Sequence, residues 1–255
     1  MPMERIADIQ PALAWLASRP SSEAMTGYDM HGWPDSTWIL HAIYENDSLR
    51  DMGSHDDLHK AALREGLAEP LVINGVDLDD ATTDSGIPLG YTARPDGSWK
   101  RVHWADHLID VGGSLSGHAF APSFRWFPYR ASWPVSVMPP NEGSLDQESF
   151  EALLGTVAAV SHTAECFALI ATLPTGIVFE PHLWKGQIAD LPLLLELNGG
   201  PYSFTPSNIW AADRSWFVLT DYDINATKIS GSLALIDAIR GNSDLETVEW
   251  NPPER

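Results

Sequence analysis

The chain has 255 residues, of which 35 are acidic and 15 basic, so its formal net charge is −20. This charge argues against nucleic acid and anionic membranes as partners, because both would repel the protein before any contact formed. It favours binding to a basic partner, although solubility alone would also account for it.

The composition, with 44% hydrophobic and 20% charged residues, is typical of a globular protein. The net charge is −6 over residues 1–68, −4 over 69–142 and −10 over 143–255, so the last part holds half of the excess. We expect a single compact unit over 1–255, with a subdivision into 1–142 and 143–255 as the alternative.

The single cysteine, Cys166, lies in an apolar run and is expected to be a buried thiol. Glu4 and Asp8 stand where a signal peptide needs cations. The chain also has no stretch of about 18 apolar residues. The sequence therefore predicts no membrane segment and a cytoplasmic location.

The first part of the chain is predicted to be helical. Apolar residues between Ile6 and Leu16 follow helical spacing, and residues 36–44 are typical of a short buried helix. Ser54 and Asp57 form a capping box, which begins a helix that ends near Gly66.

From about residue 70 the pattern favours strands. Asn74-Gly75 is typical of a type I′ turn and predicts a hairpin over 71–78. A second hairpin is predicted around Pro95-Asp96-Gly97, between 89–93 and 99–104. Two further strands are predicted at 124–129 and 134–138, in a segment rich in proline and aromatic residues.

The last part combines helices and strands. A helix over 145–160 is predicted to begin with a capping box of Ser144 and Gln147, and a strand over 167–173 follows. The remaining elements are strands at 216–222 and 226–230, a helix at 233–240 between Ser232 and Gly241, and a strand at 246–250. The predicted fold is α+β, with N-terminal helices, an antiparallel β-meander centre and a C-terminal β-β-α-β unit.

The segment from Asp213 to Ser232 resembles the C-terminal signature of an uncharacterised bacterial protein family. The matching residues are DRSWFV at 213–218, TDYD at 220–223, Thr227, and Gly231-Ser232. The resemblance extends from this segment to the end of the chain, and looser agreement occurs at 38–47, 54–59 and 132–136. The family has no known activity, so the resemblance implies no mechanism.

His55 and His59 are spaced as i and i+4, which places two imidazoles on one helix face, as a zinc site requires. The alternative is a capped, solvated first turn, because Asp56 is too short for the general base of a zinc protease. His103 and His107 repeat the spacing across a strand-to-helix junction and are not expected to bind a metal. We predict no cofactor and no metal, with His55 and His59 as the alternative metal site.

Four aspartates, Asp77, Asp79, Asp80 and Asp84, resemble part of a calcium loop. Thr82 occupies the place that such a loop reserves for glycine, and the closing glutamate is missing. A solvated strand end is therefore favoured.

Asp221 and Asp223 alternate at the end of a predicted strand, so both carboxylates face the same side. Paired carboxylates can catalyse glycoside hydrolysis. Aspartate is also common in turns, and the turn role is favoured.

Residues 124–134 concentrate aromatic side chains and arginines, which suits a recognition surface; the alternative is a core strand. The leading hypothesis is an acidic cytoplasmic binding protein, for example an immunity-type protein that neutralises a basic protein partner. Asp213, Asp221 and Asp223 would then supply charge, and Trp126 or Tyr129 apolar contact. The competing hypothesis is an enzyme that acts on a carbohydrate or another small molecule through Asp221 and Asp223.

Overall fold

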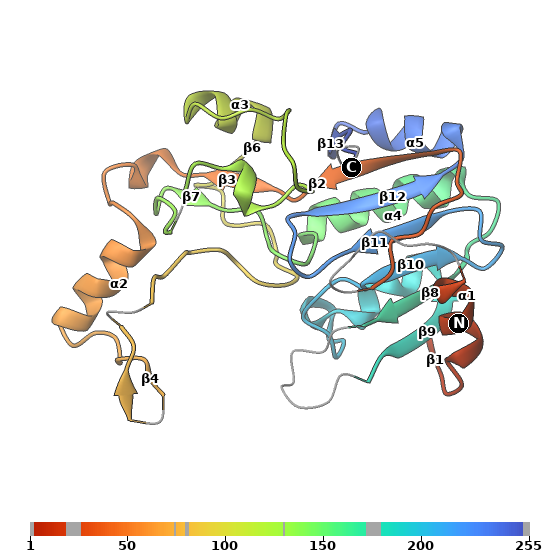
Figure 1. The fold of residues 1–255 in the computed structure, drawn as a ribbon, viewed down its shortest axis with the longest axis horizontal. Coiled ribbons are helices and arrows are strands. Elements are labelled where there is room, and N and C mark those ends of the chain that lie inside the picture. The colour runs from red at the N-terminus through yellow and green to blue at the C-terminus, as the bar shows by residue number, and fades with distance from the viewer. Residues whose placement is uncertain are drawn as a thin grey trace.

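The computed structural model describes residues 3–18, 27–73, 75–79, 82–129, 131–171 and 180–251. Over these ranges the chain forms an eight-stranded sheet, a three-stranded sheet and a two-stranded hairpin, together with helices (Figure 1). The α+β class predicted from the sequence is confirmed.

The strands of the large sheet all pair antiparallel, in the order β1, β9, β8, β10, β11, β12, β2, β13. Their bounds are β1 (Glu4–Ile6), β2 (Asp35–Leu40), β8 (Glu165–Ile170), β9 (His182–Gln187), β10 (Asn208–Ala211), β11 (Phe217–Thr220), β12 (Ala226–Gly231) and β13 (Glu246–Val248). Strand β2 comes from the first part of the chain and lies between β12 and β13 from the last part. The sheet therefore joins both parts of the sequence.

Each face of this sheet is covered. Side chains alternate between faces along a strand, so Ile209 of β10 packs toward α4 (Gln147–Val160) and α5 (Leu233–Arg240), while its neighbour Trp210 points the other way. On that second face Trp210 packs with Leu16 of α1 (Gln10–Ala17) and with Met30. The core consequently has one apolar cluster on each side of the sheet.

A third apolar cluster lies beside the sheet, around the buried Trp104, Trp126 and Trp133. It is enclosed by β3 (Ile43–Glu45), β6 (Lys100–Val102), β7 (Val137–Met138), α3 (Trp104–Asp110) and the 3-10 turn η2 (Phe124–Trp126). Glu246 of β13 accepts hydrogen bonds from the backbone N–H groups of Trp104 (2.8 Å) and Ala105 (3.3 Å). These bonds cap α3 and attach this cluster to the large sheet.

The helix predicted over 36–44 is wrong, because these residues form β2 and β3. Strand β2 is paired on both sides, with β12 and β13, and its last four residues are all buried. A strand buried on both faces loses the polar–apolar alternation that distinguishes it from a helix.

The hairpin predicted around Pro95–Gly97 is also wrong. Asp96 and Trp99 form a turn there, but β6 pairs with β3. Residues 89–93 form no strand, although Leu89 makes an isolated bridge to Glu142. Of the strands predicted at 124–129 and 134–138, the first is the turn η2 and the second shortens to β7.

Helix α4 forms as predicted but begins with a different cap. The Asp146 carboxylate accepts from the Ser149 N–H (3.0 Å) and from the Tyr44 hydroxyl (2.6 Å). Ser144 is buried and its hydroxyl lies 3.2 Å from that of Thr205. Later in the chain lie the 3-10 segments η3 (Ile188–Leu194) and η4 (Glu196–Asn198).

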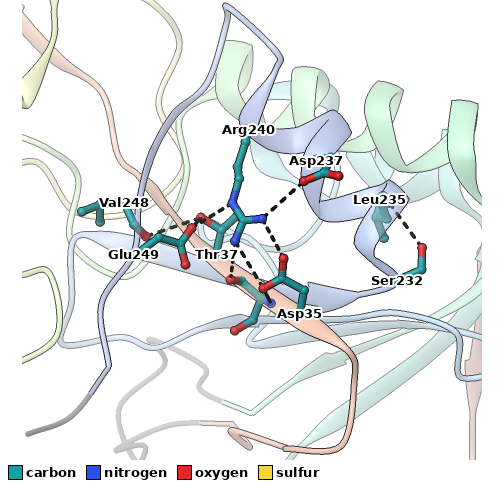
Figure 2. A network of polar contacts seen from close by, with 9 residues as sticks. Asp35, Thr37, Ser232, Leu235, Asp237, Arg240, Val248 and Glu249 are labelled. Atoms are coloured by element: carbon teal, nitrogen blue, oxygen red, sulfur yellow. Dashed lines mark hydrogen bonds and ion pairs between the residues drawn. The ribbon is translucent and has the colours of Figure 1, made fainter.

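The closing β-β-α-β unit is confirmed as β11, β12, α5 and β13, and Ser232 caps α5 as predicted. Figure 2 shows how Arg240, at the end of α5, attaches this helix to the sheet. Its guanidinium donates to the Asp35 carboxylate (2.7 and 3.2 Å) and to Glu249 (2.9 Å). Strand β2, from the first part of the chain, thus meets α5 and the residue that follows β13 at one side chain.

Candidate binding surface

The described residues between 46 and 86 form an arm that leaves the three-stranded sheet after Glu45 and projects away from both larger sheets (Figure 1). The arm contains η1 (Asp47–Leu49), α2 (His55–Arg64) and the hairpin of β4 (Val72–Ile73) and β5 (Val76–Asp77). It carries ten acidic and three basic residues, so it holds −7 of the total charge of −20. The acidic excess is therefore concentrated on a projecting element.

Local chemistry accounts for the helix in the arm. The Ser54 hydroxyl accepts from the Asp57 N–H (3.2 Å), and the Asp57 carboxylate accepts from the Ser54 N–H (3.0 Å), which confirms the predicted capping box. The hydrogen bond from the Ser54 backbone holds the pKa of Asp57 below its usual value. At the other end Leu67 N–H donates to Ala62 (2.8 Å), and Gly66 has a φ of 69°, as a glycine after a helix often does.

The root of the arm is attached by backbone hydrogen bonds to the segment around Trp133. His55 N–H donates to the Trp133 carbonyl (3.0 Å), and Trp133 N–H donates to Ser85 (3.0 Å). Gly86, with a φ of 75°, packs beside the His55 imidazole, and a Cβ at this position would collide with the ring. The position of the arm's base is thus determined by specific contacts.

Beyond Asn46, no residue of the arm whose side chain the structure describes is buried. All ten residues of α2 are described, and none of them is buried. Several large apolar side chains of the arm are exposed to solvent, and Leu67 is 77% exposed. The exposed apolar residues are Met52, Leu58, Leu67, Leu71 and Val72.

Three carboxylates alternate with these apolar side chains along the chain. Asp51 precedes Met52, Glu65 lies two residues before Leu67, and Glu69 lies two residues before Leu71. All three are exposed, and none forms an ion pair or a side-chain hydrogen bond with any residue that the structure describes. This surface therefore presents uncompensated negative charge beside apolar area.

The aspartates predicted from sequence lie in turns. Asp213 is exposed and accepts from the Ser215 N–H (3.0 Å). Asp221 is 6% exposed, and its carboxylate accepts from the Asp223 N–H (3.3 Å), so these two residues share a turn rather than facing each other across a cleft. The half-buried Glu142 has a pKa raised by its burial and by the charge of Asp223. Asp221 is too deeply buried to meet a protein partner directly.

The aromatic candidates are also more buried than a contact surface requires. Trp126 is 4% exposed, and its indole N–H donates to the Phe120 carbonyl (3.0 Å). The exposed phenylalanines here are Phe124 and, just before the segment, Phe120, with the Arg125 guanidinium 4.8 Å from the centre of the Phe120 ring. Sequence analysis did not single out these two, because the turn η2 decides which of these aromatic side chains are exposed and which are buried, and the sequence does not predict that turn.

Tyr129 is half-buried and belongs to a polar cluster beside Trp133. Its hydroxyl lies 3.3 Å from His107 Nε2, and His107 Nδ1 lies 2.6 Å from Glu45 Oε1. The His107 ring stacks on Trp133 with 6.0 Å between ring centres. Glu45 and His107 were not expected to interact, because they are far apart in the sequence.

The candidate metal ligands do not converge. His55 Nε2 is buried without a hydrogen-bond partner, and His59 Nε2 lies 3.9 Å from Asp79. Within the described ranges, no three histidine, cysteine, aspartate or glutamate side chains group as metal ligands. In the calcium-like segment, Asp80 and the side chain of Asp77 lie outside the described residues.

A buried polar chain around His41 was missed by sequence analysis. His41 Nδ1 lies 2.6 Å from the Asn141 carbonyl, and Nε2 lies 3.1 Å from the Thr227 hydroxyl, which in turn is 2.9 Å from that of Thr220. Burial lowers the pKa of His41 to about 4, so its imidazole is neutral and donates from Nδ1. Cys166, as predicted, is a buried thiol, and burial raises its pKa to about 12.

No family model, curated protein or solved structure matches the chain. None of the helices in the described ranges is long and apolar enough to cross a membrane.

Proposed function

We propose that this protein is an acidic binding protein whose partner is a basic protein, with an immunity-type protein that neutralises a basic toxin as the concrete form. The observation that carries the proposal is the acidic arm, which concentrates a net charge of −7 in residues 46–86. The resemblance of residues 213–232 to a bacterial family is compatible with this role but implies no activity.

Electrostatics supports such a role for the arm. Asp47, near the base of the arm, pairs with Lys100 of β6 (3.2 Å). The field of the unpaired carboxylates farther along the arm extends into solvent and accelerates encounter with a cationic partner. The exposed carboxylates of Asp51, Glu65 and Glu69 pair with no cation that the structure describes, so they can pair with a cation of the partner. Pairing them across an interface would compensate charge that the fold leaves unpaired.

The experiment is affinity purification from the native host's lysate with wild-type protein and with the arm variant Asp51→Asn/Glu65→Gln/Glu69→Gln. A matched control, Asp110→Asn/Glu196→Gln/Asp244→Asn, removes three exposed acidic residues elsewhere. The expected result is one basic protein that is retained at low salt by the wild type and the control but lost by the arm variant.

Equal recovery of that protein by the wild type and the arm variant would show that the arm does not bind it. Recovery of no basic protein at either ionic strength would remove the proposed function. For the immunity form, co-expression of the wild type with the recovered protein should restore growth, and co-expression of the arm variant should not.

A further inference from the structure

We propose that the arm docks an amphipathic basic segment of the partner, in which lysine or arginine side chains alternate with apolar ones on a helix face. This inference rests on the proposed function and deepens it by naming the surface and the partner's chemistry. The residues that would make the contact are exposed along the arm: the apolar Met52, Leu58, Leu67, Leu71 and Val72, and the carboxylates Asp51, Glu65 and Glu69.

The first argument is the exposure of the apolar side chains. Leu67 is 77% exposed and Val72 is 54% exposed, on an element with no buried helix residue. When a partner covers apolar area that was in contact with water, the binding free energy becomes more favourable by about 25 cal/mol for each Å² removed from water. A partner that was basic but wholly polar would leave this area uncovered.

The second argument is the arrangement of charge. Each unpaired carboxylate lies one or two residues from an exposed apolar side chain, as Glu65 does from Leu67 and Glu69 from Leu71. Contacts of both kinds must therefore form side by side. An amphipathic basic helix offers this combination, because residues three and four apart share a face while cations flank it.

The same charge decides against a second copy of this chain. Two arms in contact would bring together two surfaces with a net charge of −7 each. Like charges placed across an interface cost several kcal/mol, roughly as much as such contacts contribute when the charges are opposite. The occupant is therefore a cationic segment of a different protein.

A direct test uses a synthetic helical peptide of about 18 residues in which lysine and leucine follow helical spacing. A second peptide keeps every lysine and replaces each leucine by serine. Binding of both peptides is measured by titration calorimetry at about 50 and about 300 mM salt, on either side of the ionic strength where screening becomes strong. The lysine–leucine peptide is expected to bind more tightly, and both are expected to weaken at high salt.

The decisive variant is Leu67→Ser/Leu71→Ser, with Leu193→Ser/Leu197→Ser as the matched control, because those two leucines are 55% and 48% exposed outside the arm. The arm variant should bind the lysine–leucine peptide at least about tenfold more weakly, while the control should bind as the wild type does. Amide hydrogen exchange of α2 should slow when the peptide binds and remain unchanged elsewhere.

The outcomes separate the two proposals. If both peptides bind equally and only Asp51→Asn/Glu65→Gln/Glu69→Gln weakens them, apolar docking is wrong and the electrostatic function stands. If neither set of arm substitutions affects either peptide, the arm is not a binding surface and both proposals fail. If the wild type is a dimer that Leu67→Ser/Leu71→Ser converts to a monomer, the occupant is a second copy, which overturns the inference.

Discussion

Arg240 and Asp35 are 205 residues apart in the chain and are joined by two hydrogen bonds, of 2.7 and 3.2 Å, between guanidinium and carboxylate. Figure 2 shows that Glu249 and Asp237 surround the same guanidinium. Both partners of the bidentate pair are partly buried, with side-chain exposures of 30% and 25%. The pair therefore connects α5 to β2 in a network rather than as an isolated surface contact.

We expect Arg240→Lys to lower the free energy of unfolding by about 1 kcal/mol, because lysine cannot form the bidentate contact. Arg94→Lys is the control, since Arg94 makes a single contact of 3.3 Å to Glu148 and should contribute less than about 0.5 kcal/mol. Urea denaturation measures both. Equal effects of the two substitutions would contradict the role of the network.

The same pair has a defined pH dependence. The hydrogen bond from Arg240 lowers the pKa of Asp35 below its ordinary value of 3.8. Its contribution to stability is therefore complete above that value and is lost as the pH falls through the lower folded-state pKa. The destabilising effect of Arg240→Lys should shrink in strongly acidic solution, as measured by denaturation at a series of pH values.

His41 predicts a second loss of stability in acid, at higher pH than that of Asp35. The pKa of His41 falls from 6.5 to about 4 on burial, so the unfolded chain binds a proton more readily than the folded protein between these values. The contribution of His41 to the free energy of unfolding is therefore complete above pH 6.5 and should decrease by about 2 kcal/mol as the pH falls to about 5. In His41→Gln this decrease should be absent, whereas the exposed control His162→Gln should retain it. An unchanged slope in His41→Gln would show that other groups cause acid unfolding.

Asp146 should contribute more to the free energy of unfolding than Ser144 and Gln147, the residues predicted from sequence to cap α4. Asp146→Ala removes the cap on Ser149 and leaves the buried Tyr44 hydroxyl without an acceptor. The expected loss is about 2–4 kcal/mol in the free energy of unfolding. Gln147→Ala removes only a bond to Glu151 and should cost less than about 0.5 kcal/mol. Similar costs for the two would favour the cap predicted from sequence.

The two serine caps should differ in effect: loss of the Ser54 cap should promote only local unfolding, and loss of the Ser232 cap should promote global unfolding. Ser54→Ala removes the cap of α2, which has no buried residue, so amide exchange in that helix should accelerate about fivefold while global stability is unchanged. Ser232→Ala removes the cap of α5, whose Leu235, Ile236 and Ile239 are in the core. It should lower the global free energy of unfolding by about 1 kcal/mol. A global effect of Ser54→Ala would mean that the arm unfolds together with the sheet.

The position of the acidic surface was only partly predictable. Net charge indicated a basic partner, but counting over 1–68, 69–142 and 143–255 divided the arm between two windows and assigned half of the excess to the last part. A count over 46–86 would have found the concentration, yet nothing in the sequence marks where the arm leaves the body. Trp126 shows the same limit, because its burial depends on the packing of Trp104 and Phe127 around it.

The elements that sequence alone determined are those whose causes lie within a few residues. The Ser54–Asp57 capping box, the Ser232 cap and the hairpin of β4 and β5 form as predicted, because each depends on a local hydrogen bond or turn. Only the tertiary structure decided that β2 is a strand and that residues 46–86 project into solvent. Both depend on partners elsewhere in the chain: β2 is held by β12 and β13, while α2 lacks any surface that buries it.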